Sequence, residues 1–300
     1  MEHSTEKAFM KLNAVIYGTD LSVFSQNAGL YAALMAKQFS AKLVVVHAFT
    51  LSQAAMEVEI DGSLLSQQRK DLHLLLSQKA AALACGTVPV IPVLRDGEPA
   101  EELRRLATTY EPAMLVLGTH GGGWLQRELI GSVAERVLRT TRWPTLTVGP
   151  SVPPASSGQS LHRILFATDL SPATAAAAAV AVQFAEAAGA ELDVLHVVKR
   201  GADTQRLNAL KDRYSRALDA VLAKKPDAFD DLKSFIEAGD AHERILEHIR
   251  DRAIDLLVLG IRKTSHLGIR TKSSGAFPLI VHARCPVLTI TSGPGHSYSR

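Results

Sequence analysis

Short, continuously hydrophobic segments alternate along this chain with longer stretches rich in alanine and leucine. In the first 150 residues the hydrophobic segments are "AVIYG", "LVVVHAF", "VPVIPVL", "AMLVLG" and "TLTVG". Unbroken apolar runs of this length are typical of strands buried on both faces of a parallel sheet. The stretches between them predict helices over 27–39, 64–84, 98–110 and 132–140.

The same order of segments occurs a second time. Asp20 in the first "TDLS" and Asp169 in the second are 149 positions apart, whereas Gly118 and Gly260, which end the two "LVLG" segments, are 142 apart. The second copy therefore lacks seven residues in its middle. A repeat of this length indicates two related domains and not a solenoid, whose units are much shorter.

Alternating strands and helices predict the α/β class. We expect two doubly wound, open domains in tandem, each with a five-stranded parallel sheet covered by helices on both faces. The predicted domains span 10–149 and 161–292, and the segment 150–160, rich in Pro, Gly and Ser, is predicted to link them. In such sheets, ligands bind beyond the carboxyl ends of the strands.

The composition of the chain argues against several classes of function. A net charge of +3 from 33 basic and 30 acidic residues, with no run of five like charges, argues against nucleic-acid binding. The two cysteines have no CxxC spacing, which argues against a disulfide framework or a zinc site. No apolar stretch approaches 18 residues and no signal peptide is evident, so we expect a cytoplasmic protein that does not bind membranes.

The fourth predicted strand leads into a glycine-rich segment, "GTHGGGWLQRELIGS" (118–132). Gly118, Gly121, Gly131 and Ser132 have the spacing G-x2-G-x9-G-S. Glycine lets backbone N–H groups approach phosphate oxygens closely, and the start of the next helix offers further free N–H groups. On spacing alone, a tight turn without a ligand is an equally good interpretation. The segment is not a Walker A loop.

Several further motifs accompany this spacing in order: "GTDLS" and "ATDLS", "VVHAF" and "VLHVV", "DGEP", and "VLGTHG". Together they resemble the universal stress protein family over most of both halves. The resemblance implies a tandem member with two Rossmann-like domains. It also implies, as in a subset of that family, ATP binding through the glycine pattern of the first domain.

The resemblance implies roles for individual residues of the first domain. Asp20 would reach the ribose, Gly18 and Thr19 would shape that wall, and Ala48 would contact adenine through its main chain. The other implied residues flank the nucleotide or surround its phosphates: Leu117, Gly118, His120, Gly121, Gly131, Ser132 and Val133. Whether the nucleotide is ATP, ADP or AMP, and whether Mg²⁺ accompanies it, stays open.

Two of these residues have a plainer interpretation. Asp20 ends a strand, where aspartate commonly forms a turn or caps a helix. His120 is interpreted as an exposed loop position and not as a catalytic base, because no carboxylate or nucleophile is fixed beside it in the sequence. His47 and His196, which lie near the ends of apolar strands, are interpreted as structural.

The second copy departs from the glycine pattern. At the four equivalent positions it has Gly260, Lys263, Ser273 and Ser274. Two of three glycines are replaced, so we expect one competent site, in the first domain, and a second domain with a structural or regulatory role. Pro278 falls inside the equivalent of the helix predicted over 132–140 and is expected to break it or shift its start.

The leading hypothesis is an ATP-binding stress-response protein that regulates an unknown protein partner and has at most slow ATP hydrolysis. An alternative is an enzyme of the same nucleotide-binding α/β group, with weak ATPase, phosphoryl-transfer or adenylyl-transfer activity. A third is a nucleotide-free interaction module. The fifth strands, "TLTVG" and "VLTIT", are expected to pair antiparallel within the chain, and whole chains could form a homodimer.

Overall fold

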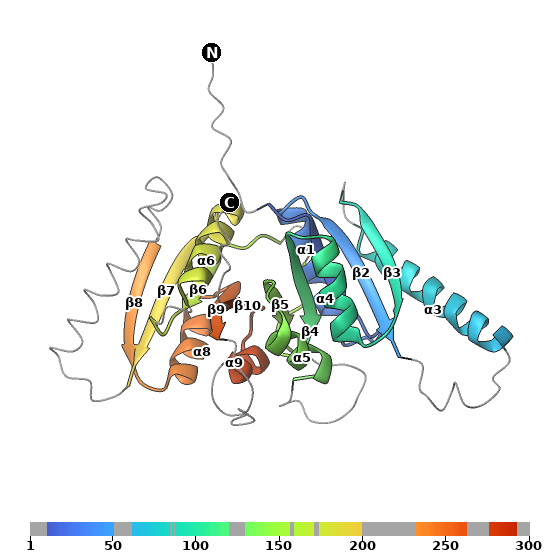
Figure 1. Ribbon diagram of the computed structural model, residues 1–300. Coiled ribbons are helices and arrows are strands. Elements are labelled where there is room, and N and C mark those ends of the chain that lie inside the picture. The colour runs from blue at the N-terminus through green and yellow to red at the C-terminus, as the bar shows by residue number, and fades with distance from the viewer. Residues whose placement is uncertain are drawn as a thin grey trace, which may run out of the picture.

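The computed structural model describes residues 11–50, 62–84, 86, 88–119, 130–156, 159–170, 174–199, 232–262 and 276–292. The first half contains five strands and four described helices, and the second half contains five strands and three described helices (Figure 1). The first half comprises β1 (Ala14–Gly18), α1 (Gln26–Gln38), β2 (Lys42–Phe49), α3 (Gly62–Ala82), β3 (Val90–Asp96), α4 (Pro99–Thr109), β4 (Ala113–Gly118), α5 (Ser132–Thr140) and β5 (Thr145–Val148). The second comprises β6 (Arg163–Ala167), α6 (Thr174–Ala188), β7 (Glu191–Val198), β8 (Leu232–Ala238), α8 (Ala241–Asp251), β9 (Leu256–Arg262), α9 (Ala276–His282) and β10 (Val287–Ser292). Each predicted strand is present, and the four predicted helices lie within two residues of their expected bounds.

The strands form one sheet of ten, in the order β3-β2-β1-β4-β5-β10-β9-β6-β7-β8. Within each half, all strand pairs are parallel. The halves join where β5 pairs antiparallel with β10, with Leu146 opposite Leu288. Hydroxyl groups reinforce this junction, because Thr147 Oγ1 donates to Val287 O and Thr289 Oγ1 donates to Thr145 O, both at 3.1 Å. The expected pairing of the fifth strands is therefore present.

Helices cover both faces of the sheet. The helices α1, α3 and α6 pack on one face, and α4, α5, α8 and α9 pack on the other. The strands are apolar on both faces for this reason: in β1, Val15 belongs to the first core and Ile16 to the second. Continuous hydrophobic segments are what such a three-layer arrangement requires.

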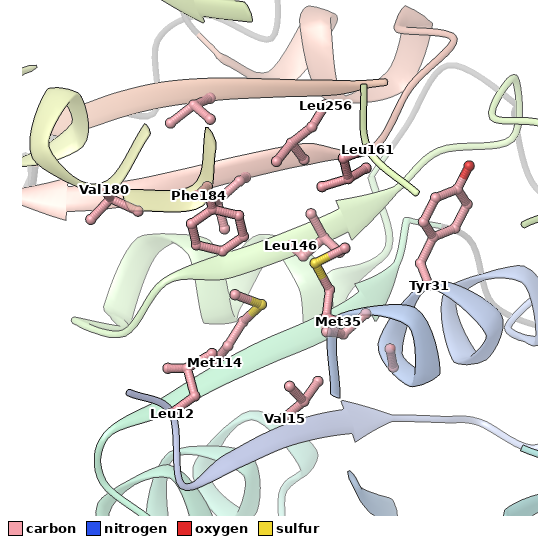
Figure 2. Packing of buried hydrophobic residues seen from close by; sticks show 14 of the residues in the cluster. Leu12, Val15, Tyr31, Met35, Met114, Leu146, Leu161, Val180, Phe184 and Leu256 are labelled. Atoms are coloured by element: carbon pink, nitrogen blue, oxygen red, sulfur yellow. The ribbon is translucent and has the colours of Figure 1, made fainter. Parts of the chain in front are cut away.

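The core on the α1 and α6 face is continuous across the two halves. Figure 2 shows Met35, Met114 and Leu146 of the first half in the same cluster as Phe184 and Leu256 of the second. Each of these five side chains is at most 1% exposed. On the opposite face, most of the buried side chains fall into two separate clusters, one for each half.

Local sequence signals explain where the helices begin. The Glu98 side chain accepts a hydrogen bond from the Glu101 amide at 2.9 Å, and Pro99 occupies the first turn of α4. Asp240 caps α8 by accepting from the amides of His242 and Glu243. These caps place the two helices directly after strands β3 and β8.

Pro278 does not break its helix, and the expected shift of the helix start concerns residues 274 and 275, which lie outside the described residues. It is the third residue of α9, in the first turn, where no backbone N–H donor is needed within the helix. The helix continues to His282, the position equivalent to Thr140 at the end of α5. The proline is therefore accommodated at the beginning of the helix.

The described part of the predicted linker is docked against α1. Asn27 Nδ2 donates to Val152 O at 2.9 Å, and Ala155 N donates to Asn27 Oδ1 at 3.3 Å. Tyr31 Oη adds a third contact by donating to Pro153 O at 3.2 Å. None of the described helices is both long enough and apolar enough to cross a membrane.

Candidate functional site

A cavity of about 200 Å³ opens at the carboxyl ends of β1, β2 and β4. Nine of the eleven residues predicted for a nucleotide site line it: Gly18, Thr19, Asp20, Ala48, Leu117, Gly118, Gly131, Ser132 and Val133. The other two, His120 and Gly121, lie outside the described residues. The structure thus gathers around one cavity residues that are up to 115 positions apart, from Gly18 to Val133.

The cavity has further lining residues that sequence analysis did not assign to the site. They are Ser25, Val46, His47, Pro99, Leu103 and Ala134. His47 was interpreted as structural. Its Nδ1 donates to Thr19 O at 2.9 Å, so it also lines the cavity and anchors the turn after β1. Its recurrence as His196 was the available signal, because a polar residue at the same place in two apolar strands indicates a specific contact.

The turn after β1 is fixed at Thr19. The Thr19 amide donates to Val46 O at 2.9 Å, and its carbonyl accepts from His47. The Thr19 hydroxyl lies 2.9 Å from the Ser25 hydroxyl and accepts from the Leu21 amide at 3.0 Å. Every polar atom of Thr19 therefore has a hydrogen-bond partner. The backbone from which Asp20 extends is held in place by these bonds.

Asp20 is exposed at the wall of the cavity and organises the next residues of the turn. Its Oδ1 accepts from the Ser22 amide at 3.0 Å and from the Ser22 hydroxyl at 2.7 Å. Leu21 between them has a φ of 64°, in the left-handed region that a residue with a side chain rarely occupies. Strain of this kind persists where the surrounding contacts hold it.

The opposite wall of the cavity is the beginning of α5. Gly131 precedes the helix, and its amide donates to Thr119 O at 2.7 Å. No side chain caps this helix, and within the described part of the chain the first-turn amides of Ser132, Val133 and Ala134 have no acceptor. The positive end of the helix dipole and three N–H groups therefore border the cavity, an arrangement that attracts an anion.

Two of the three described glycines of the site, Gly18 and Gly131, serve different purposes. A Cβ on Gly18 would lie 2.7 Å from Leu117 Cδ2 and 3.1 Å from Leu103 Cδ1, so a side chain at 18 would crowd the apolar wall of the cavity. Gly131 has an ordinary φ of −59°, and among the described residues a Cβ there would meet only the Thr119 carbonyl, at 3.3 Å. The backbone at 131 therefore requires no left-handed residue.

The second half retains the turn after its first strand. His196 Nδ1 donates to Thr168 O at 2.8 Å, the Leu170 amide donates to Thr168 Oγ1 at 3.0 Å, and Leu170 has a φ of 57°. Ala167 stands where the first half has Gly18. The residues equivalent to the rest of the glycine pattern, Lys263, Ser273 and Ser274, lie outside the described residues.

Comparison with known proteins agrees with the fold. The sequence matches the Universal stress protein family twice, over residues 12–149 and 160–291. The chain belongs to the universal stress protein family. This membership agrees with the tandem arrangement of two Rossmann-like halves seen in the structure.

Among its relatives, this universal stress protein is 31% identical over 137 residues to Universal stress protein MJ0531 of Methanocaldococcus jannaschii, a match that covers 45% of this chain and 80% of the relative. It is 30% identical over 139 residues to Universal stress protein Rv2005c of Mycobacterium tuberculosis, covering 46% of this chain and 45% of that protein. Both matches thus cover about half of this chain.

Several solved structures span almost the whole chain. One of them is the crystal structure of a universal stress protein from Archaeoglobus fulgidus, with a TM-score of 0.69 and 22% identity over 94% of this chain and 99% of that one. At this identity the likeness shows the fold alone.

No group of three or more His, Cys, Asp or Glu side chains that could hold a metal ion occurs among the described residues. The polar groups that line the cavity are hydroxyls, backbone amides, one carboxylate and one imidazole. This set suits hydrogen bonding to a sugar and to an anion.

Proposed function

We propose that the first half of this protein binds an adenine nucleotide, ATP in the leading case, and that occupancy regulates binding of a protein partner during the stress response. The main support for this proposal is that nine predicted residues line one cavity. Asp20 lies on one wall of this cavity and the start of α5 lies on the other. The two walls offer complementary chemistry, because a carboxylate accepts hydrogen bonds from ribose hydroxyls and a helix start donates them to phosphate oxygens.

The apolar part of the cavity suits the base. Val46, Leu103 and Leu117 line it, and Ala48 offers its main chain on β2. A nucleotide bound this way would lie across the carboxyl ends of β1, β2 and β4, where ligands of open parallel sheets bind. The proposal assigns no catalytic residue, and the protein acts by binding.

Regulation would follow from the position of α5. A ligand shifts a conformational equilibrium only when it binds one state better than another. Phosphates held by the amides of Ser132 and Val133 would stabilise the beginning of α5, and a partner that contacts this end of the helix would respond to occupancy.

Titration of the purified full-length chain with ATP tests the proposal. We expect one nucleotide per chain. Asp20→Asn should weaken binding about tenfold or more, because a hydrogen bond to a charged acceptor contributes about 1.5–3 kcal/mol. The matched control is Asp169→Asn, the same change at the equivalent position of the second half, which should leave the affinity unchanged.

A second variant tests the phosphate side. Gly121→Lys copies the residue found at position 263 of the second half and should abolish binding by filling the phosphate cradle. Two equal sites per chain, or equal weakening by Asp20→Asn and Asp169→Asn, would contradict a single site in the first half. An absence of binding for ATP, ADP and AMP alike would overturn the proposed function.

A further inference from the structure

Three buried residues with hydroxyl groups, Tyr17, Thr19 and Ser25, are connected by hydrogen bonds around the turn that carries Asp20. Tyr17 Oη donates to Ser25 O at 2.5 Å, and Ser25 Oγ lies 2.9 Å from Thr19 Oγ1. Ser25 Oγ also contacts Ser22 O at 3.0 Å, which ties the start of α1 to the turn. Tyr17, Thr19 and Ser25 are 2%, 7% and 3% exposed, so these hydrogen bonds are largely shielded from water.

The Thr19 hydroxyl connects Ser25 to the strained residue of the turn, Leu21. Thr19 Oγ1 accepts from the Leu21 amide, and Leu21 holds a φ of 64°. A left-handed conformation is unfavourable for leucine, so contacts around it must hold it in place. The Thr19 hydroxyl is one such contact, and its own orientation depends on Ser25.

The Tyr17 hydroxyl is suited to act permanently as a hydrogen-bond donor. Burial raises the pKa of its phenol, and this effect outweighs the hydrogen bonds from Ser25 and Thr19 that would lower it. The tyrosine therefore keeps its proton and continues to hold the Ser25 carbonyl. The start of α1 is fixed to β1 by this bond.

We propose that Tyr17 and Ser25 are positioning residues that fix the Thr19–Ser22 turn and thereby hold the Asp20 carboxylate in place for the ribose hydroxyls. This inference rests on the proposed function, which supplies the ribose. Neither residue is required to touch the nucleotide for this role.

The second half provides an internal comparison. It keeps the threonine, the aspartate and the left-handed leucine, with Leu170 N donating to Thr168 Oγ1. At the position of Tyr17 it has Phe166, which cannot donate. The left-handed leucine and its hydrogen bond to threonine thus form without a tyrosine hydroxyl, so the role of Tyr17 is to make this turn more rigid and not to create it.

The test compares ATP with 2′,3′-dideoxy-ATP, which lacks both ribose hydroxyls. The wild-type chain should prefer ATP by about tenfold or more, as expected for hydrogen bonds to a carboxylate. In Ser25→Ala and in Tyr17→Phe this preference should fall to about threefold or less, while the affinity for the dideoxy nucleotide changes little. Asp20→Asn gives the lower limit of the preference for ATP over the dideoxy nucleotide. Ser25→Thr, which keeps the hydroxyl, should retain the wild-type preference.

A purely structural role would weaken both nucleotides equally and leave their ratio unchanged, and that outcome would overturn the inference. Amide hydrogen exchange in the absence of nucleotide provides the second arm. Ser25→Ala and Tyr17→Phe should speed exchange at the Leu21 amide, while exchange in the strands stays slow. Unchanged exchange at Leu21 would also overturn the inference, whether or not ATP binds. If the wild-type chain binds no nucleotide, the proposed function and the ribose role fail together, and exchange then decides only whether the hydroxyls hold the turn.

Discussion

Gly18 shows how a single missing side chain shapes the cavity. Leu117 and Leu103 fill the space where its Cβ would be, with the nearest carbon at 2.7 Å. The second half has Ala167 at the equivalent position, so the two halves differ by one methyl group at the floor of the site. The apolar wall of the cavity thus depends on this glycine.

We expect Gly18→Ala to destabilise the protein by about 1–3 kcal/mol and to weaken ATP binding, because the added methyl group overpacks a filled core and pushes the leucines toward the nucleotide. Chemical denaturation and ATP titration measure the two effects. Adding Leu117→Val, which removes the crowding atom, should recover part of both losses.

The reverse change, Ala167→Gly, is the matched control in the second half. It should not alter the affinity for ATP. If Gly18→Ala binds ATP as tightly as the wild type, the glycine does not shape the binding site.

At the same scale, sequence analysis found residues that recur or that belong to a pattern. Asp20, Gly131 and Ser132 were found because they fit a family pattern. Ser25 and Leu103 were not, since a serine at a helix start and a leucine in a helix have many ordinary roles. Only the fold shows that α1 and α4 place these two residues at the same cavity as Asp20.

Among the elements, α8 of the second half packs on the sheet in an unusual way. His248 Nδ1 donates to Glu237 at 3.2 Å and its Nε2 donates to Asp193 at 3.3 Å. Arg252 Nε donates to Asp193 at 2.7 Å, and its guanidinium lies over the Phe235 ring, 5.1 Å from the centroid. The side chain of Asp193 is fully buried and that of His248 is 4% exposed.

The first half is apolar at the same place. Val44, Leu106 and Tyr110 occupy the positions of Asp193, His248 and Arg252. Val44 and Leu106 are buried in the core between β2 and α4. A helix that packs through hydrophobic contacts in one half therefore packs through a buried ionic cluster in the other.

This cluster makes the stability of the second half dependent on pH. Burial opposes the charged form of His248, but hydrogen bonds to Asp193 and Glu237 outweigh it and raise the pKa of His248 above its usual value. Burial would likewise raise the pKa of Asp193, but hydrogen bonds from His248 and Arg252 outweigh it and the pKa is lowered. The His248 contribution is full below about pH 6.5 and is lost as pH rises through the raised pKa, and the Asp193 contribution is lost as pH falls below about 4.

We therefore expect the free energy of unfolding to fall between pH 5.5 and pH 8.5 as His248 loses its proton. His248→Leu should cost about 1.5–3 kcal/mol, because it removes one hydrogen-bond donor from the buried Asp193 carboxylate, while the Arg252 guanidinium remains. The double variant Asp193→Val/His248→Leu copies the first half at two of the three positions and keeps the partly exposed Arg252. It should recover most of that loss and remove most of the pH dependence. Urea denaturation at pH 5.5 and pH 8.5 measures the free energy of unfolding of the wild type, the single variant and the double variant. A wild-type stability that rises over this interval would show that the cluster does not hold a charged histidine.

Sequence analysis did not identify this cluster. Asp193, Glu237 and His248 lie up to 55 positions apart, and a polar residue in a strand or helix is usually assigned to a solvent-facing side. Comparing the two copies position by position was the available signal, because Asp193 stands where Val44 is buried. The strands themselves were predictable, since each one is a short hydrophobic segment between polar turns.

In the whole molecule, the two halves share one hydrophobic core. Phe184 of α6 packs edge-on against Phe39, which follows α1, with ring centroids 4.7 Å apart. Phe184 is 1% exposed and lies in the cluster that includes Met35 and Leu146 of the first half. The halves are therefore expected to unfold together in one transition.

We expect Phe184→Ala to lower the stability of both halves by about 3–5 kcal/mol, the usual cost of removing a buried aromatic side chain. Both tryptophans, Trp124 and Trp143, belong to the first half, so their fluorescence reports that half while the substitution is in the other. Circular dichroism reports the helices of both. Coincident transitions at lower denaturant concentration are expected, and a fluorescence transition that stays at the wild-type midpoint would show that the halves unfold independently.

The antiparallel contact between β5 and β10 has a consequence for how this protein can change. When two identical subunits pair through such an edge, every substitution appears on both sides of the contact, because one gene encodes both subunits. Joined within a single polypeptide, each side can accumulate its own substitutions, so one side can keep its ligand while the other takes a separate task. The ratio of the two tasks is then fixed at one to one in every molecule, whatever the concentration of protein in the cell.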